Sequence, residues 1–194
     1  MKRIDSSANP RFKELRLLVE SSRERRKSGR SVLDGAHLVA AYQEHVGQPE
    51  GIAVSRAGLE NPEIRGLLDR MKEVETVVLS DTLFKALSSV ATPTGILAVV
   101  ETPGPGPLPR EMDACVMLED LQDPGNLGSI LRSCAAAGVR HVLLSRNAVH
   151  AWSPRVLRAG MGAHFALSIY EGIDLRAAAR EFPGKRVATQ QRSS

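Results

Sequence analysis

Residues 119–138 contain the side chains whose types and spacing could do chemistry. An apolar run at 116–118 is typical of a strand, and a Gly/Pro turn follows before a helix begins. We expect Asn126 to cap that helix and Gly138 to end it. Near the helix start lies Arg132, where the macrodipole opposes a positive charge. An amide and a guanidinium at the carboxyl edge of a strand stand where open α/β sheets bind ligands, and a guanidinium can bind an oxyanion or a phosphate.

The same helix must hold the arginine away from the core. Its apolar residues recur at i, i+4 and i+7 (Ile130, Cys134 and Ala137), which predicts a buried stripe. Arg132 lies about 200° around the helix from Ile130. We therefore expect its guanidinium to lean toward the helix N-terminus, into a cleft at the mouth of the turn. The alternative is an ordinary solvated arginine behind a helix cap.

The elements that position this segment alternate between strands and helices, which predicts an α/β fold in two parts. The boundary is the Pro/Gly-rich stretch that begins at Thr102. We expect an N-terminal domain at 1–101, a linker at 102–111 and a second, mostly parallel domain at 112–194. The first domain is expected to contain helices at 10–27, 36–45, 64–71 and 81–87 and strands at 31–35, 51–55, 76–80 and 95–100. The second is expected to contain strands at 114–119, 140–145, 164–170 and 185–190 and helices at 127–137, 154–161 and 174–181.

Composition excludes several classes of protein. The chain of 194 residues is 42% hydrophobic, without a run long enough to span a membrane and without a secretion signal at its start, so we expect a cytoplasmic protein. Its two cysteines, Cys115 and Cys134, fall in a predicted strand and a predicted helix, which favours free thiols over a disulfide. The five histidines show no ligand spacing, so no metal site is predicted.

Positive charge is concentrated at the N-terminus. Residues 1–30 hold ten Lys and Arg residues against four acids, a net charge of +6 in a chain whose total is +4. Such a cluster attracts a polyanion through counterion release, although a solvated helix face is the alternative. Because the segment contains one aromatic residue, we expect contacts to phosphate and to RNA shape rather than base stacking. The expected contacts are Arg11, Lys13, Arg23, Arg25 and Arg26.

Four fragments, in order across about 165 residues, resemble the SpoU (TrmH-type) family of RNA 2′-O-ribose methyltransferases. The residues at 123–135 are similar to its first signature motif. The family usually has Glu where this chain has Asp34, and Ser where it has Gly160. The fragments are Ile4-x-Ser6-x-x-Asn9-Pro10-x-x-Lys13 with Arg23-x-Arg25-Arg26 and Asp34-Gly35-x-His37, Thr92-Pro93-x-Gly95-Ile96-Leu97-Ala98-Val99, Asp123-Pro124-x-Asn126-x-Gly128-x-Ile130-x-Arg132-x-Cys134-Ala135, and Ser153-Pro154-Arg155-Val156-Leu157-Arg158-Ala159-Gly160-Met161-Gly162-Ala163-His164-Phe165.

The resemblance implies a fold and an activity. It implies a small RNA-binding domain, a knotted methyltransferase domain of the SPOUT type, S-adenosylmethionine as cofactor, rRNA or tRNA as substrate, and a homodimer. Arg132 would be the catalytic arginine and Asn126 would help to shape the site. Arg155, Arg158 and His164 could extend the RNA surface, or the two arginines could be ordinary exposed helix residues.

The family also carries a Gly-x-Glu-x-x-Gly loop and a Pro-rich loop that make the knot and most of the cofactor pocket. This chain stops at Ser194, before either of them. We therefore expect a fragment or a degenerate relative in which the cofactor-binding residues are unknown. A non-catalytic RNA-binding protein is the main alternative. A Rossmann-type enzyme is a weaker one, because the chain lacks the Gly-x-Gly-x-x-Gly spacing and a Walker lysine.

Overall fold

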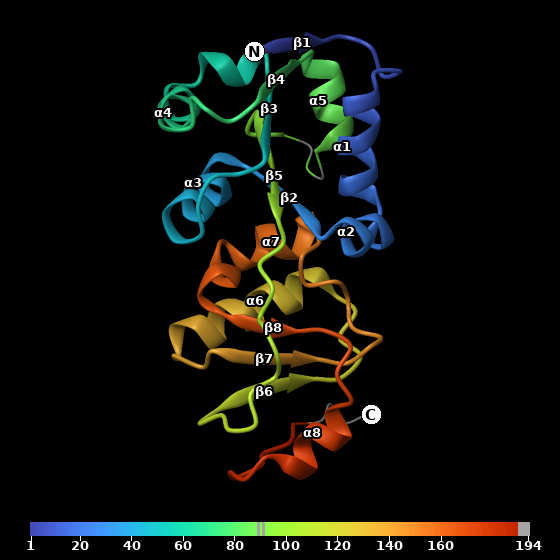
Figure 1. The fold of residues 1–194 in the computed structure, drawn as a ribbon, viewed down its shortest axis with the longest axis vertical. Helices are drawn as coiled ribbons and strands as arrows, with labels where there is room; N and C mark the ends of the chain where they lie inside the picture. The colour runs from blue at the N-terminus through green and yellow to red at the C-terminus, as the bar shows by residue number, and fades with distance from the viewer. Residues whose placement is uncertain (89, 91, 190–194) are drawn as a thin grey trace.

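The computed structural model describes residues 1–88, 90 and 92–189. Two sheets lie one above the other along the long axis of the molecule, the N-terminal sheet at the top of Figure 1 and the second below it. This agrees with the predicted α/β fold in two parts.

The first sheet has five strands: β1 (Lys2–Ile4), β2 (Arg30–Asp34), β3 (Gly51–Ser55), β4 (Thr76–Leu79) and β5 (Ile96–Glu101). Their spatial order is β1-β4-β3-β5-β2. β1, β4 and β3 run parallel, while β5 pairs antiparallel with both β3 and β2. The sheet is therefore mixed, with a parallel half and an antiparallel half.

Helices cover both faces of this sheet (Figure 1), and the strands are accordingly apolar on both sides. α1 (Pro10–Glu20) and α5 (Asp81–Leu87) pack on one face, against alternate strand residues such as Val77 and Leu79. α3 (Ala36–His45) and α4 (Pro62–Arg70) pack on the other, against Val78. Successive strand residues point to opposite faces of the sheet, so apolar side chains are presented to the helices on both sides.

The second sheet has three strands, β6 (Cys115–Leu118), β7 (His141–Leu144) and β8 (Ser168–Tyr170). All pair in parallel, in the order β6-β7-β8. α6 (Pro124–Ala136) and α7 (Pro154–Gly160) connect them, and the short η2 (Ala163–Ala166) leads into β8. Because α8 (Leu175–Glu181) buries none of its residues fully, the edge strand β6 stays half-buried along its whole length.

The two sheets share one continuous apolar core. Residues of α3 and β2 pack in the same cluster as residues of α6, α7 and β7. At the junction the ring of Tyr42 meets that of Phe165 edge-on, with centroids 5.5 Å apart. Side chains from one half therefore help to place side chains of the other.

The structure corrects four predicted elements. The strand expected at 164–170 is a strand only in β8 (Ser168–Tyr170), because η2 (Ala163–Ala166) occupies its beginning. The helix expected at 10–27 is two helices, because Ser21 ends α1 and caps α2 (Ser22–Ser28). β1 was not expected, since one of its three residues is apolar and its hydrogen bonds come from β4. Residues 185–189 of the strand expected at 185–190 are not a strand, and position 190 lies outside the described residues.

The linker follows β5 without a helix or strand from Thr102 to the start of β6. It is anchored at its first residue, whose backbone N–H donates to the carbonyl oxygen of Gly29 at 2.7 Å and whose hydroxyl lies 2.7 Å from that of Ser31. The domain limits at 101 and 112 stay a prediction. Among the described residues no helix is both long and apolar enough to cross a membrane.

Candidate functional site

The cap of α6 is Asp123, not Asn126 as predicted. The Asp123 carboxylate accepts the backbone N–H of Asn126 at 2.6 Å, and Pro124 occupies the first helical position. A carboxylate at this position also complements the helix dipole. The side chain of Asn126 is exposed and makes no hydrogen bond among the described residues. The predicted end of the helix is confirmed, since Gly138 adopts a positive φ of 73° just beyond it.

Because α6 begins at Pro124, Arg132 is the ninth of its thirteen residues. The macrodipole falls off within the first turn, so the predicted electrostatic cost at this arginine is wrong. Arg132 is exposed, and within the part of the chain that the structure describes it makes no hydrogen bond or ion pair. It is not among the lining residues of the two larger cavities, beside β6 and at the junction of the two halves, and the cleft expected around it stays a prediction.

The buried face of α6 also differs from the predicted stripe. Leu127, Gly128, Leu131 and Cys134 are buried, whereas Ile130 is half-buried. Ala137, the third residue of the predicted stripe, is exposed. The face is set by α7, which packs directly on α6.

Hydrogen bonds tie together the loops that follow β6 and β7. The Asp120 backbone N–H donates to the Ser145 hydroxyl at 2.8 Å, and that hydroxyl donates to the Asp120 carboxylate at 2.8 Å. The Val149 N–H donates to the Leu121 carbonyl oxygen at 2.8 Å. These hydrogen bonds therefore fix the two loops to each other at the carboxyl edge of the second sheet, where α6 begins.

The predicted RNA contacts on α1 and α2 divide into exposed and buried side chains. Arg11, Lys13, Arg23 and Arg26 are exposed. Of these, Arg11 forms an ion pair with Glu75 and Arg26 forms a longer one with Glu171. Lys13 and Arg23 make no ion pair among the described residues, and contact of all four side chains with RNA stays a prediction.

Arg25 is buried, 5% exposed, which corrects its assignment as a contact to RNA. Its Nη1 donates to the carbonyl oxygens of Leu18 at 2.7 Å and Val19 at 2.9 Å, and its Nε donates to Nδ1 of His150 at 3.3 Å. Burial, and next the neighbouring Arg26, lower the pKa of Arg25. The guanidinium links the carboxyl end of α1 to the second half of the chain.

Replacing Arg25 with alanine is expected to lower the free energy of unfolding by about 2 kcal/mol, because two buried carbonyl oxygens and an imidazole nitrogen lose their donor. Urea unfolding measures the change. The matched control is Arg23→Ala, an exposed arginine two residues earlier, which should change stability by less than about 0.5 kcal/mol. Equal losses in the two variants would contradict a bridging role for Arg25.

The residues expected to extend the RNA surface are also separated by the structure. Arg155 is exposed, and Arg158 is half-buried with its Nη1 3.6 Å from a carboxylate oxygen of Asp34. His164 is 1% exposed, so its predicted place on that surface is wrong. The ring of His164 is tilted against that of Trp152, with centroids 5.3 Å apart, and its Nε2 lies 2.9 Å from the carbonyl oxygen of Ala151.

Burial lowers the pKa of His164 to about 4, although the hydrogen bond to Ala151 acts in the opposite direction. The unfolded chain takes up a proton at this histidine below about pH 6.5, and the folded chain does not. The contribution of the neutral His164 ring to the free energy of unfolding is therefore fully present above pH 6.5 and is lost as the pH falls toward 4. Between pH 7 and pH 5 we expect this loss to lower the free energy of unfolding by about 2 kcal/mol.

The measurement is urea unfolding at both pH values, compared between the wild type and His164→Gln. The variant should lose less stability than the wild type on acidification, whatever its stability at pH 7. The exposed His45 provides the control, and His45→Gln should keep the wild-type pH dependence. An unchanged pH dependence in His164→Gln would show that this ring is not the titrating group.

The described residues form one cavity, beside β6, whose charge does not suit S-adenosylmethionine. They contain no group of three or more His, Cys, Asp or Glu side chains that could hold a metal ion. This cavity, of about 840 Å³, lies between β6 and α8. Arg176, Lys185 and Arg186 line it against the single carboxylate of Glu119. A positive lining opposes a ligand whose sulfonium and ammonium groups are cations.

The sequence contained a signal for the missed cap. Three other helices begin with the same pair of residues, a capping side chain followed by proline, at Asn9, Asn61 and Ser153. Asp123 repeats that pair. Arg146, which lines a cavity at the junction of the two halves, had no such signal, because part of that lining, Arg25 and Arg26 of α2, is distant in sequence.

Comparison with known proteins links both halves of the chain to one family. A family model described as the SpoU rRNA Methylase family matches residues 113–194, and one described as the MRM3-like substrate binding domain matches residues 9–98. The chain is 34% identical over 182 residues to "rRNA methyltransferase 3, mitochondrial" of Mus musculus. That match spans 89% of this chain and 42% of the relative.

Solved structures agree. A structure described as an RNA 2′-O ribose methyltransferase has a TM-score of 0.74 and 30% identity, over 92% of this chain and 68% of that one. The SpoU methyltransferase AviRb from Streptomyces viridochromogenes, in complex with AdoMet, has a TM-score of 0.73 over 89% of this chain and 66% of its own; at 23% identity it shows the fold alone. The chain belongs to the SpoU/TrmH-type (SPOUT) family of RNA methyltransferases.

Proposed function

We propose that this chain takes part in the 2′-O-methylation of ribose in rRNA, with S-adenosylmethionine as the methyl donor. The observation that carries the proposal is Arg132, an uncommitted guanidinium on the exposed side of α6, in the segment that matches the SpoU family. The names of the relatives support the reaction and the class of RNA. A bound AdoMet is described for the AviRb neighbour, which supports the donor.

Arg132 would act on the ribose oxygen. The 2′-hydroxyl is a very weak acid, and its oxygen gains negative charge as it forms a bond to a methyl carbon. A guanidinium stays protonated in a protein, so it donates hydrogen bonds to that oxygen rather than accepting its proton. Its planar fork can also bind the adjacent phosphate in a bidentate manner. The proposed role is therefore to position the ribose and stabilise its charge.

Asn126 is proposed to shape the same site from the first turn of α6, where its side chain is exposed. The exposed cations of α1 and α2 would hold the RNA through its phosphates. The cations are Arg11, Lys13, Arg23 and Arg26, with Arg155 and Arg158 on α7.

A homodimer and a cytoplasmic location remain predictions for this chain. The Mus musculus relative is named as mitochondrial. Three cations, Arg176, Lys185 and Arg186, line the cavity between β6 and α8, and this observation favours the second candidate function, RNA binding without methyl transfer.

Two measurements test the proposal. The first is transfer of a labelled methyl group from S-adenosylmethionine to rRNA, with the product located as bonds that resist alkaline cleavage. The second is calorimetry with S-adenosylmethionine alone. Methyl transfer confirms the reaction. RNA binding without cofactor binding or transfer would favour the second candidate and overturn the first.

A further inference from the structure

A cavity of about 500 Å³ lies at the junction of the two halves, apart from Arg132 and Asn126. Its lining comes from α2 and the linker on one side, and from the loops after β7 and β8 on the other. Those two loops form the carboxyl edge of the parallel sheet, the edge at which open α/β sheets bind ligands. Its lining residues are Arg25, Arg26, Gly29, Thr102, Arg146, His150, Glu171 and Gly172.

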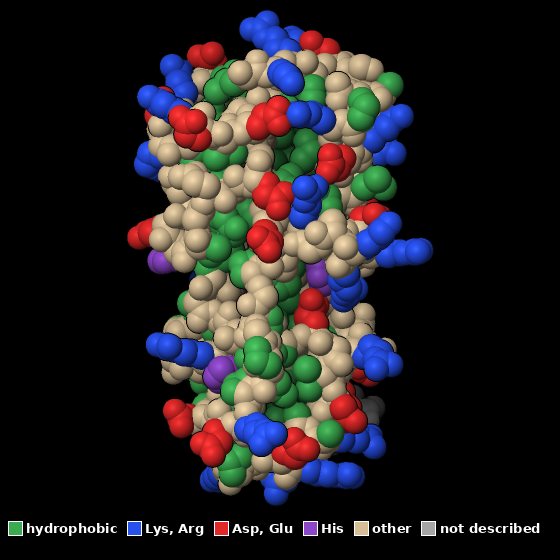
Figure 2. All heavy atoms as spheres, viewed as in Figure 1, with side chains coloured by type: hydrophobic (Ala, Val, Ile, Leu, Met, Phe, Trp, Pro, Cys, Tyr) green, Lys and Arg blue, Asp and Glu red, His purple; other side chains and the backbone are tan. Residues whose placement is uncertain are grey.

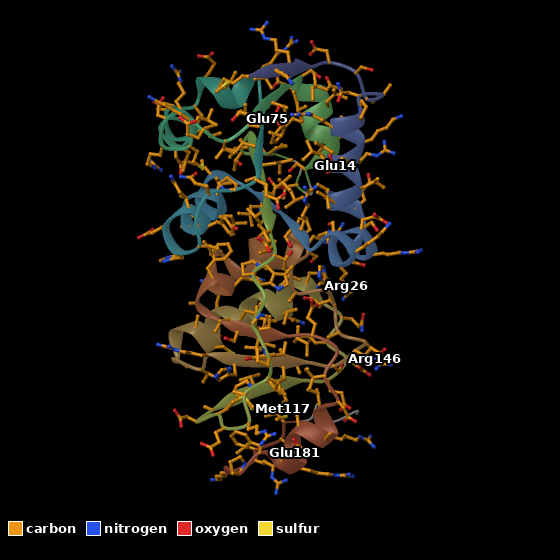
Figure 3. All side chains as sticks on the ribbon, in the orientation of Figure 1. Glu14, Arg26, Glu75, Met117, Arg146 and Glu181 are labelled. Atoms are coloured by element: carbon orange, nitrogen blue, oxygen red, sulfur yellow. The ribbon has the colours of Figure 1, made fainter. Side chains whose placement is uncertain are left out.

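Two exposed arginines face this cavity from opposite sides. Arg26 comes from α2, and Arg146 from the loop after β7. Figure 3 shows both on the same side of the molecule, one above the other across the junction. Arg146 makes no hydrogen bond or ion pair among the described residues, and Arg26 makes a loose ion pair, 3.6 Å, with Glu171. Both guanidinium groups therefore keep N–H donors without a close acceptor among the described residues.

Beneath them is a rigid base of buried polar groups. Arg25 donates through Nε to Nδ1 of His150, whose Nε2 lies 3.4 Å from Glu171. Burial, with Arg26 and Arg25, lowers the pKa of His150 to about 3, so the ring is neutral. A neutral ring whose Nδ1 accepts a hydrogen bond must carry its proton on Nε2, which points it at the carboxylate.

The only acid in this lining is turned toward the protein. One Glu171 oxygen accepts the backbone N–H of Ala151 at 3.0 Å, and the other faces His150. Three guanidinium groups therefore stand against one carboxylate that is already engaged. In Figure 2 Lys/Arg, acidic and histidine side chains gather on one side of the waist of the molecule. The cavity carries a net positive charge that its own residues leave uncompensated.

The entrance is open to a bulky anion. Gly29 and Gly172 line it, and a Cβ added at either would meet no atom within 4 Å. A phosphate group is tetrahedral and accepts hydrogen bonds through more than one oxygen. It therefore suits two guanidinium forks that approach from opposite sides. The described lining contains no Phe, Tyr or Trp ring that could stack on a base, and its one imidazole, His150, is buried.

We propose that this cavity binds one phosphodiester group of the RNA backbone, held between Arg26 and Arg146 on the base formed by Arg25, His150 and Glu171. The inference rests on the proposed function, since it takes RNA as the ligand. It adds a subsite that joins the two halves of the chain through one phosphate. Binding there would fix the position of the RNA relative to both halves.

The test is the affinity for a fluorescent RNA hairpin over a range of salt concentrations. Arg146→Gln should weaken binding about tenfold at low salt and reduce the slope of log K against log salt by about 0.9. Arg140→Gln is the matched control, because this substitution removes the same charge from an exposed arginine. Arg140 directly precedes β7, whereas Arg146 follows that strand. Arg140→Gln should leave affinity and slope close to the wild type.

Glu171→Gln provides a change of the opposite sign. The amide oxygen can still accept the Ala151 N–H, while the negative charge is removed. RNA should bind severalfold more tightly to this variant. Equal affinities for Arg146→Gln and Arg140→Gln would overturn the subsite, and so would weaker binding by Glu171→Gln.

Two further outcomes separate the ligand from the function. If inorganic phosphate raises the melting temperature of the wild type but not of Arg146→Gln, while hairpin affinity is equal in both, the ligand is a free phosphate and the assignment to RNA is wrong. If the wild type binds no RNA, the proposed function fails as well. If the wild type binds RNA and transfers methyl groups but Arg146→Gln matches the control, the subsite alone fails.

Discussion

Replacing Arg132 with alanine is expected to lower the rate of methyl transfer to RNA by about 100- to 1000-fold, the loss typical of removing one donor to a developing oxyanion. Lysine at this position should be nearly as damaging. An ammonium keeps the positive charge but lacks the planar fork that can bind an oxygen and a phosphate together. The measurement is single-turnover methyl transfer with saturating S-adenosylmethionine.

The controls for Arg132 are Arg140→Lys and Arg140→Ala. Arg140 is an exposed arginine between the end of α6 and the start of β7. Both Arg140 variants should transfer methyl groups at the wild-type rate. Because Arg132 is exposed and makes no hydrogen bond or ion pair with the described residues, its variants should keep the wild-type stability. A lysine variant with wild-type turnover would rule out the bidentate role.

Replacing Gly128 with alanine is expected to destabilise the fold by about 3 kcal/mol or more. Helix propensity alone predicts the opposite sign, since alanine is favoured over glycine within a helix by about 1 kcal/mol. Packing decides, because α6 and α7 meet at this residue. A Cβ at Gly128 would overlap the Cβ of Ala159 and lie 2.7 Å from both the Ala159 carbonyl carbon and the Gly160 nitrogen. Backbone atoms cannot rotate away, so the helices must separate.

Gly66→Ala in α4 is the matched control for Gly128→Ala. A Cβ at Gly66 would meet only the end of the Arg70 side chain, at 3.8 Å. This variant should be stabilised by roughly 0.5–1 kcal/mol through helix propensity. Urea unfolding of both variants measures the two signs. A stabilised Gly128→Ala would show that the two helices do not pack as closely as the structure has them.

Two glycines mark this interface for different reasons. Gly128 allows the close approach of two helices, and Gly160 makes room for a ring, since its Cβ would lie 2.5 Å from Cε1 of His164. The family resemblance predicts a serine at position 160, where this chain has glycine. The buried imidazole next to it gives a steric reason for glycine in this chain.

Local features of the chain could be predicted because they depend on neighbours in sequence. Alternating apolar residues and turn residues predicted β3, β4 and β5, α3 and α5, and the parallel series of the second sheet. The proline after each capping residue marks four helix starts. Charge counts alone indicated a polyanion partner.

Other features depend on residues distant in sequence. β1 exists because β4 supplies its hydrogen bonds, and the buried face of α6 was mistaken because α7 selects it. The prediction also treated every arginine of α2 alike, whereas Arg25 turns inward to His150, 125 residues away.

The amino-acid order by itself therefore determined the α/β class, the family and the basic N-terminus, since each is carried by periodicity, motif or composition. Only the tertiary structure decided which arginines are exposed without a partner among the described residues, because the partners of a guanidinium come from segments distant in sequence. The junction cavity arises in the same way: Arg26 and Arg146 are far apart along the chain, and the shared core of the two sheets brings them to one place.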